Sequence, residues 1–163
     1  MTGEPMSAAD AWRVLDEVMD PEVPVLSVRD LGIVREIRAA RSGLEVVVTP
    51  TYSGCPATEV IERSIREALL AAGATAVDVE TRLSPAWTTD WIGDAAKEKL
   101  RQHGIAPPPR CVEGGARPIR FVPACPRCGA RRTEELSRFG ATACKSLHRC
   151  LECREPFEYV KPL

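Results

Sequence analysis

The chain has 163 residues, of which 44% are hydrophobic and 28% are charged, and its formal net charge at pH 7 is -1. This length allows one ordinary domain and a small second one, and the composition excludes a wholly disordered chain. No apolar run is long enough to span a bilayer, and residues 1–10 lack the basic and apolar segments of a secretion signal. We therefore expect a cytoplasmic protein without a membrane partner.

The first predicted elements are a helix and a hairpin. Ser7 is a suitable N-cap for a helix whose apolar residues recur at helical spacing, and Asp20, which precedes a proline, should end it. Two β-branched runs, residues 33–39 and 45–49, are separated by a short turn that contains glycine. These runs predict two antiparallel strands.

A second helix, a third strand and a third helix follow in the chain. Apolar residues keep helical spacing over residues 60–72, and residues 76–83 are rich in strand formers. Because a strand, a helix and a second strand usually form a right-handed crossover, the third strand should pair in parallel with one of the first two. The third helix is predicted at residues 89–103, where Trp87 and Trp91 flank its start and should help to pack it on the sheet.

Two further segments follow this first domain. Residues 105–118 are rich in proline and glycine and can sustain neither helix nor strand, so we predict a linker there. Residues 119–163 form a segment too small to fold by apolar burial alone, and a bound metal would supply the missing stability. The predicted fold class is therefore α+β: a small α-β-β-α-β-α sandwich over residues 1–104 with a C-terminal zinc ribbon.

The last segment contains two Cys-x-x-Cys pairs that are separated by 21 residues. Two residues between cysteines let a tight turn direct both sulfurs at one ion. A reducing compartment also favours metal ligands over disulfides. We predict one structural zinc ion, and its ligands would be Cys125, Cys128, Cys150 and Cys153.

Two alternatives stay open for this metal site. Cys144 and His148 lie just before the second pair, so a ligand set of three cysteines and one histidine has a suitable spacing. Iron is the other alternative, because four thiolates also suit it. Residues 119–163 carry 9 Lys and Arg against 5 Asp and Glu, and metal-bound thiolates would offset part of that charge. So small a positive charge does not favour nucleic-acid binding, and we expect protein partners instead.

A fifth cysteine, Cys55, lies between the second strand and the second helix. Because the proline that follows it is favoured at the first helical position, Cys55 is predicted at the N-cap, where the helix dipole lowers the pKa of a thiol. The alternative is a buried cysteine that packs as a small apolar residue. No histidine lies nearby in the sequence, so nothing supports nucleophilic catalysis. Cys111, in the predicted linker, is interpreted as having no role.

Several motifs resemble known families. Residues 20–24 (Asp-Pro-Glu-Val-Pro), 28–34 (Val-Arg-Asp-Leu-Gly-Ile-Val) and 51–56 (Thr-Tyr-Ser-Gly-Cys-Pro) resemble the iron-sulfur-assembly domain of the SufT-like family. Residues 85–92 (Pro-Ala-Trp-Thr-Thr-Asp-Trp-Ile), followed by the cysteine-rich tail, narrow the resemblance. Nearly the whole chain is similar to the PaaD (also called PaaJ) family of the bacterial phenylacetyl-CoA epoxidase system.

The resemblance implies an accessory protein, not an enzyme, that helps to mature a multicomponent epoxidase of aerobic phenylacetate catabolism. Cys55 would bind or hand on iron or a transient iron-sulfur cluster, for which a thiolate is the required ligand form. Asp20, Glu22 and Thr51 would support it. A local alternative for the two acidic residues is that Asp20 ends the first helix and Glu22 is solvated in a turn.

The implied partners are the proteins of the epoxidase complex. A ferredoxin-type reductase subunit is the expected client, because its cluster needs cysteine ligands whereas a diiron site needs carboxylates and histidines. A homo-oligomer stays open as well. The alternative function is a non-catalytic docking or structural subunit of the complex, in which Cys55 is structural.

Overall fold

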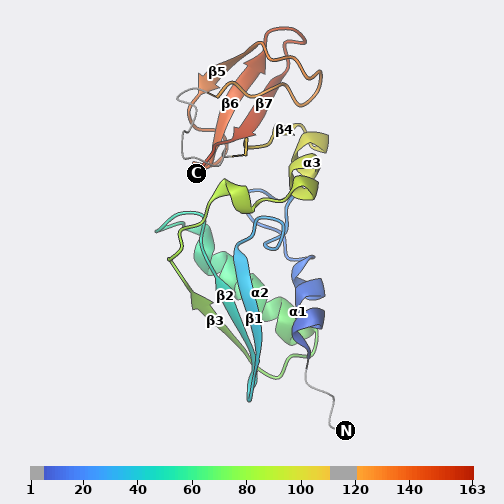
Figure 1. Ribbon diagram of the computed structural model, residues 1–163, viewed down its shortest axis with the longest axis vertical. Coiled ribbons are helices and arrows are strands. Elements are labelled where there is room, and N and C mark those ends of the chain that lie inside the picture. The colour runs from blue at the N-terminus through green and yellow to red at the C-terminus, as the bar shows by residue number, and fades with distance from the viewer. Residues whose placement is uncertain (1–5, 111–120) are drawn as a thin grey trace. The chain divides into compact units, whose positions relative to one another are not determined.

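The computed structural model describes residues 6–110 and 121–163 of the chain. It divides into two compact units, Met1–Trp91 and Ile92–Leu163, and each unit has its own β-sheet (Figure 1). Within the described residues, no helix is long and apolar enough to cross a membrane.

The first helix, α1 (Ala8–Leu15), begins as predicted and ends early. The Ser7 hydroxyl oxygen accepts a hydrogen bond from the backbone N–H of Asp10 at 3.2 Å, which confirms the predicted N-cap. The predicted end at Asp20 is wrong, because α1 stops at Leu15. After α1 the backbone bonds shorten to a span of three residues, from Glu17 to Val14 and from Val18 to Leu15. The buried Asp20 carboxylate accepts backbone N–H groups from the turn that follows it.

The sheet of the first unit has the order β1-β2-β3. Strands β1 (Val34–Ala40) and β2 (Gly43–Val48) are antiparallel, and β3 (Val77–Thr81) pairs with β2 in parallel, so the predicted hairpin and crossover are confirmed. At Gly43, an added Cβ would lie 2.1 Å from the Ala76 carbonyl oxygen. Only glycine therefore lets the hairpin turn approach the start of β3 this closely.

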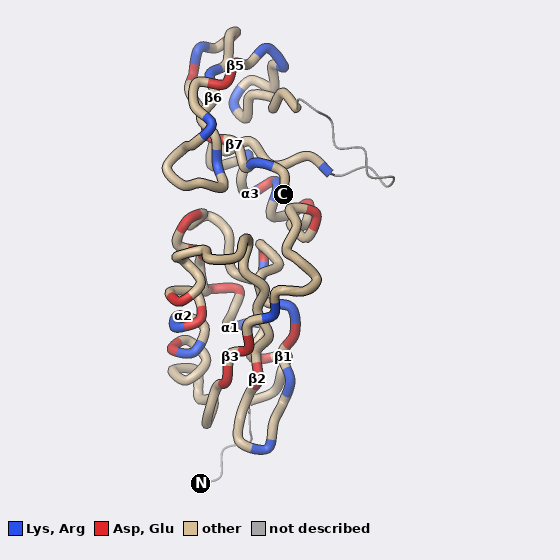
Figure 2. Tube along the Cα trace, turned by 90° about the vertical axis from the view of Figure 1, so that its left-hand side faces the viewer, with Lys and Arg blue, Asp and Glu red and all other residues tan. Residues whose placement is uncertain are grey.

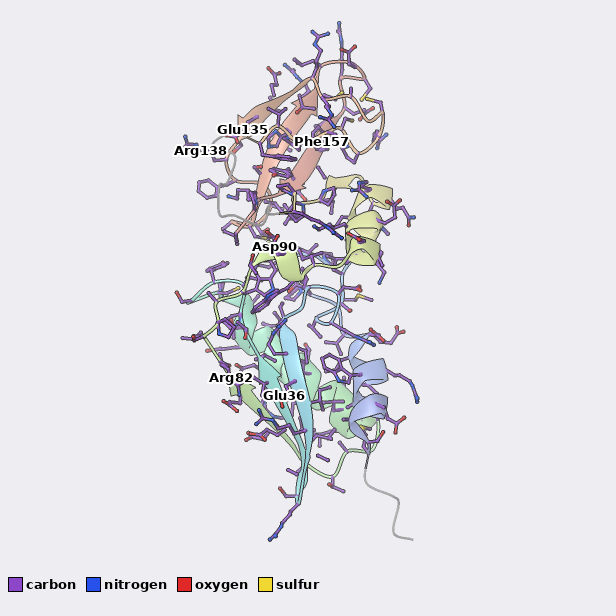
Figure 3. The ribbon with its side chains drawn as sticks, in the orientation of Figure 1. Glu36, Arg82, Asp90, Glu135, Arg138 and Phe157 are labelled. Carbon is purple, nitrogen blue, oxygen red and sulfur yellow. The ribbon has the colours of Figure 1, made fainter. Side chains whose placement is uncertain are left out.

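The core of the first unit lies between this sheet and its helices. Helix α2 (Ala57–Ala71) buries Ile61, Ile65 and Leu69, which recur at helical spacing, and α2 contacts both α1 and β3. Figures 1 and 2 show α2 on one side of the strands. The sheet also carries charged side chains, among them Glu36 and Arg82, which lie near each other in Figure 3.

The predicted third helix is two elements in the structure. A 3-10 turn, η1 (Thr89–Trp91), is followed by α3 (Asp94–Gln102), for which Gly93 is the N-cap in extended conformation. The extended backbone at Gly93 separates two elements that the apolar spacing predicted as one helix. The sequence predicts that Trp87 helps to pack this helix on the sheet. In the structure its indole is buried, and the indole N–H donates to the Leu31 carbonyl, in the loop before β1, at 2.8 Å.

The second unit contains a sheet of order β4-β7-β6-β5, which we call the ribbon. Its strands are β4 (Ile105–Ala106), β5 (Thr133–Ser137), β6 (Lys145–Cys150) and β7 (Pro156–Val160), and all pairings are antiparallel except β4 with β7. Helix α3 contacts β4 and so groups with this unit. The predicted linker thus begins with a short strand, and most of its remainder, including Cys111, lies outside the described residues.

The candidate metal centre and the Cys55 turn

The four cysteines of the two Cys-x-x-Cys pairs converge in the ribbon. Their sulfurs all lie within 4.8 Å of one another. The Cys125 and Cys153 sulfurs are 3.7 Å apart, and those of Cys128 and Cys150 are 3.6 Å apart. A tetrahedral zinc site with Zn–S bonds of about 2.3 Å has sulfur–sulfur edges of about 3.8 Å. The two measured pairs match these edges, and the four sulfurs together fit a four-thiolate metal site.

Two similar turns aim these sulfurs. The N–H of Cys125 donates to the Ala130 carbonyl at 2.9 Å, and the N–H of Cys150 donates to the Glu155 carbonyl at 3.0 Å. In each turn the fourth residue after the first cysteine has a positive φ, 75° at Gly129 and 62° at Arg154. The Cys-x-x-Cys spacing predicts both turns, but at the position of positive φ only the first turn has a glycine.

The short distances between the four sulfurs also shift the pKa values of their thiols. Burial alone would raise the pKa of Cys150, but the backbone N–H groups of Cys153 and Glu152 and the neighbouring thiols lower it to about 7. At Cys153 the N–H of Glu155 lowers the pKa, yet burial and the three other thiols raise it to about 12. One thiol thus ionises readily and another resists, because like charges at this distance repel. A cation that binds all four sulfurs must displace the remaining protons.

Cationic side chains lie beside this cluster. A hollow of about 400 Å³ next to Cys150 is lined by Arg132, Arg149 and Arg154. Arg132 pairs with Glu152 at 2.7 Å and Arg149 pairs with Glu134, and all four of these side chains are exposed to solvent. Four thiolates around one divalent ion carry a net charge of about -2, so neighbouring guanidinium groups favour that state.

The alternative ligands Cys144 and His148 do not join the cluster. The Cys144 sulfur lies 3.1 Å from the Thr142 hydroxyl. The His148 ring is buried and stacks on Phe157, which is labelled in Figure 3, and its Nε2 lies 2.9 Å from the Ser146 hydroxyl. Burial lowers the pKa of His148, although Glu135 acts in the opposite direction. These contacts describe a packed core histidine.

Cys55 lies in a turn at the start of α2. Its side chain is only 7% exposed, and its backbone N–H donates to the Tyr52 carbonyl at 3.2 Å. The predicted N-cap position is wrong by one residue, because Pro56 is the N-cap of α2. Ser53 and Gly54, just before the cysteine, are exposed, and Gly54 has a φ of 80°.

Asp20 and Glu22 are brought together in a different turn. Oδ1 of Asp20 accepts the N–H of Glu22 at 2.8 Å and that of Val23 at 2.7 Å. Thr51 is half-buried. Over residues 6–110 and 121–163, the ribbon cysteines are the one group of three or more Cys, His, Asp or Glu side chains close enough to share an ion. Cys55, Asp20 and Glu22 therefore do not form a second preformed metal site in the described chain.

Comparisons with known proteins agree with this two-part organisation. Residues 8–81 match the model of the iron-sulfur cluster assembly protein family, and residues 106–161 match that of the PaaD zinc β-ribbon domain. A putative subunit of the 1,2-phenylacetyl-CoA epoxidase of Escherichia coli (strain K12) is 46% identical over 159 residues, which are 96% of this chain and 94% of that protein.

Two further relatives match the N-terminal part. A Fe-S protein maturation auxiliary factor of Porphyromonas gingivalis is 31% identical over 93 residues, or 56% of this chain and 88% of that protein. A solved structure of a conserved hypothetical protein from Thermotoga maritima is 28% identical, with a TM-score of 0.52, and the match covers 61% of this chain and 98% of that one. The predicted α+β fold class and the family resemblance are confirmed.

Proposed function

The chain belongs to the PaaD family, and we propose that it is an accessory protein for epoxidase maturation. In this role the first unit binds or hands on iron or an iron-sulfur cluster through Cys55, and the ribbon is a docking module stabilised by zinc. Two relatives support the proposal by their names, since one is called an epoxidase subunit and the other a maturation factor for Fe-S proteins.

The observation that carries this division of labour is the closed geometry of the ribbon cysteines. All four sulfurs lie within 4.8 Å of one another, so an ion between them would have a complete set of protein ligands. Zinc in such a site has no open coordination position and no redox chemistry. A zinc-filled ribbon stabilises structure and carries no cargo, and the transfer chemistry falls to Cys55 in the other unit.

A single thiolate is suited to cargo in transit. Cys55 belongs to no group of three or more described Cys, His, Asp or Glu side chains close enough to share an ion, so further ligands for iron would come from a client protein or a second copy of the chain. The Cys55 side chain is also only 7% exposed. Transfer therefore requires the Cys55 sulfur to become more exposed than it is in this structure.

The proposed client is the ferredoxin-type reductase subunit of the epoxidase system, because its cluster is held by cysteine thiolates and can be received from another thiolate. The test compares three strains of a bacterium that encodes the chain: one with the gene deleted, one with Cys55→Ser and one with Cys144→Ser. Iron and sulfide are measured in the reductase subunit purified without oxygen. A transfer role predicts that Cys55→Ser lowers cluster content toward the level of the deletion strain.

Cys144→Ser is the matched control, because Cys144 is half-buried and lies outside both proposed sites. It should leave cluster content unchanged. A reductase that is fully loaded in the Cys55→Ser strain contradicts transfer by this residue. Metal analysis of the purified chain completes the test: about one zinc per chain is expected in wild type and in Cys55→Ser. Iron in that position would contradict the structural-zinc part of the proposal.

A docking subunit without transfer chemistry is the second candidate function, and the burial of Cys55 favours it. A small buried cysteine can serve as an apolar residue. This candidate predicts a normally loaded reductase in the Cys55→Ser strain, together with loss of epoxidase assembly when the ribbon cysteines are replaced. The same three strains, extended by Cys150→Ser, therefore separate the two functions.

A further inference from the structure

A second surface of the first unit combines arginines with tryptophans. A groove of about 680 Å³ lies where α1, the loop before β1 and the start of β1 meet. We call it the Arg-Trp groove, and its described lining residues are Ala9, Trp12, Arg13, Arg29, Gly32, Val34 and Arg35. All charged residues in this lining are arginines.

The charge of this groove contrasts with that of its surroundings. Residues 1–91 contain 8 Lys and Arg against 15 Asp and Glu, a formal net charge of -7. Three of those eight cations line one groove, and Figure 2 shows acidic positions spread over the rest of the unit. A local positive site within a negative domain selects short negative segments, because a long polyanion or an anionic membrane would be repelled by the whole unit.

Two of the guanidinium groups are held by indole rings. The Arg35 guanidinium carbon lies 3.6 Å from the centroid of Trp91, and that of Arg29 lies 5.4 Å from the centroid of Trp12. Stacking occupies the face of a guanidinium and leaves its N–H edges available for carboxylates. Gly32 permits the arrangement at Trp91, since its φ is 69° and an added Cβ would lie 2.9 Å from the Trp91 Cβ.

The present partners of these arginines can be exchanged. Arg13 pairs with Asp10 at 2.7 Å and Arg29 pairs with Asp16 at 2.6 Å, but all four side chains are exposed. Ion pairs of this kind contribute little stability and are easily replaced. Arg35 donates to the Gly32 carbonyl at 3.3 Å, and among the described residues no ion pair with a carboxylate occupies it. Its guanidinium edge can accept an incoming carboxylate without breaking a salt bridge.

We infer that the Arg-Trp groove binds an acidic segment of a partner protein, in which carboxylates meet Arg29 and Arg35 and intervening apolar side chains lie against Trp12. A volume of about 680 Å³ exceeds what a single small anion fills and suits several residues of an extended peptide. The Trp12 side chain supplies the apolar contact that aromatic residues typically provide at protein interfaces, and Trp91 holds the Arg35 guanidinium in place. This inference does not depend on transfer by Cys55.

The experiment uses the full, metal-loaded chain and two short fluorescent peptides as probes. In one peptide Glu alternates with Leu, and in the other Gln replaces every Glu. Fluorescence anisotropy should show binding of the acidic peptide that weakens as salt is added, and little binding of the neutral one. Arg35→Gln should weaken binding of the acidic peptide about tenfold, since hydrogen bonds to charged groups contribute on that scale. Arg29→Gln should also weaken it.

Arg41→Gln is the matched control, because Arg41 is exposed in the turn between β1 and β2, lies outside the groove, and loses the same charge. It should change the dissociation constant less than twofold, about the size of a surface charge effect. Equal losses in Arg41→Gln and Arg35→Gln, or equal binding of the two peptides, would overturn the inference. Inorganic phosphate is then added as a competitor. Full displacement of the acidic peptide at a low phosphate concentration would identify a small-anion site and would also overturn the inference.

Discussion

The two units of this chain are stabilised in different ways. The first unit packs apolar residues of α1 and α2 against a three-stranded sheet, with Leu15, Ile65 and Leu69 fully buried. Among its described residues, the ribbon has a hydrophobic cluster of five buried residues, and two of them, Cys125 and Cys150, are metal-ligand candidates. The first unit is therefore held by its apolar core, whereas the ribbon has a small core built around its candidate metal ligands. Substitutions in the apolar core and removal of the metal should therefore destabilise different units of the same chain.

Removal of the metal should give the largest difference between the units. Structural zinc contributes on the order of 10 kcal/mol to the folding of small metal domains, so Cys150→Ser or a strong chelator should unfold the ribbon. Amide hydrogen exchange should then lose protection in β6 and β7 while β2 and α2 keep theirs. Equal loss in both units, or in neither, would show that the two are not stabilised differently.

A cavity in the core of the first unit should have the opposite effect to metal removal, because it should destabilise the first unit and leave the metal site intact. Ile65→Ala removes a side chain with 0% exposure from the face of α2, and such truncations cost about 2 to 5 kcal/mol. Urea unfolding followed by hydrogen exchange should show a destabilised first unit, and the metal content of the chain should not change. Val60→Ala, at a position that is 38% exposed on the same helix, is the control and should cost less than about 0.5 kcal/mol.

The ribbon also contains a charged pair that its small core must accommodate. Lys145 donates to Glu158 at 2.8 Å, and the two side chains are 6% and 25% exposed. Glu158 also accepts the N–H of Ala141 at 2.9 Å. At neutral pH, Glu158→Gln should cost about 2 kcal/mol, because a hydrogen-bonded charge is lost opposite a buried lysine. The exposed Glu36→Gln of the first unit should cost less than about 0.5 kcal/mol.

The pH dependence of that pair follows from the pKa of Glu158. Burial acts to raise this pKa, but the Lys145 ammonium and the Ala141 N–H outweigh it and hold the pKa below its ordinary value of 4.5. Since the folded pKa is the lower one, the pair stabilises the chain above pH 4.5 and stops doing so as pH falls through the folded pKa. The difference in unfolding free energy between wild type and Glu158→Gln, measured with zinc in excess, should shrink on acidification. A constant difference would contradict this assignment.

Substitutions in the two Cys-x-x-Cys turns should have the smallest effects on the stability of the ribbon, and the two effects should have opposite signs. Gly129→Ala places a side chain at a φ of 75° and should cost about 1 kcal/mol. Arg154 has the same left-handed conformation, with a φ of 62°, and Arg154→Gly removes its strain. Because glycine also loses more backbone entropy on folding, the net stabilisation of the metal-bound ribbon should be only a few tenths of a kcal/mol. Chelator competition measures both variants. Destabilisation by Arg154→Gly would show that its side chain matters more than its backbone.

Local patterns were sufficient for most of the fold. The β-branched runs predicted β1 and β2, helical spacing predicted α2, and the crossover rule predicted the parallel pairing of β3. These features depend on periodicity and chain direction, which neighbouring residues encode. The ends of the helices were harder to predict from the sequence. Helix α1 ends at Leu15, before the proline that was expected to stop it, and an extended residue, Gly93, separates η1 from α3. Apolar spacing predicts neither boundary.

The ribbon site was predictable from the amino-acid sequence alone, because two Cys-x-x-Cys pairs carry their own turn geometry and need only be brought together. The environment of the remaining candidates became visible only in the folded chain. The burial of Cys55, the separation of Cys144 and His148 from the cluster, and the meeting of Arg29 with Arg35 in one groove are examples. Burial and charge environment are set by segments that are distant in the chain, whereas ligand spacing and hydrophobic period are local.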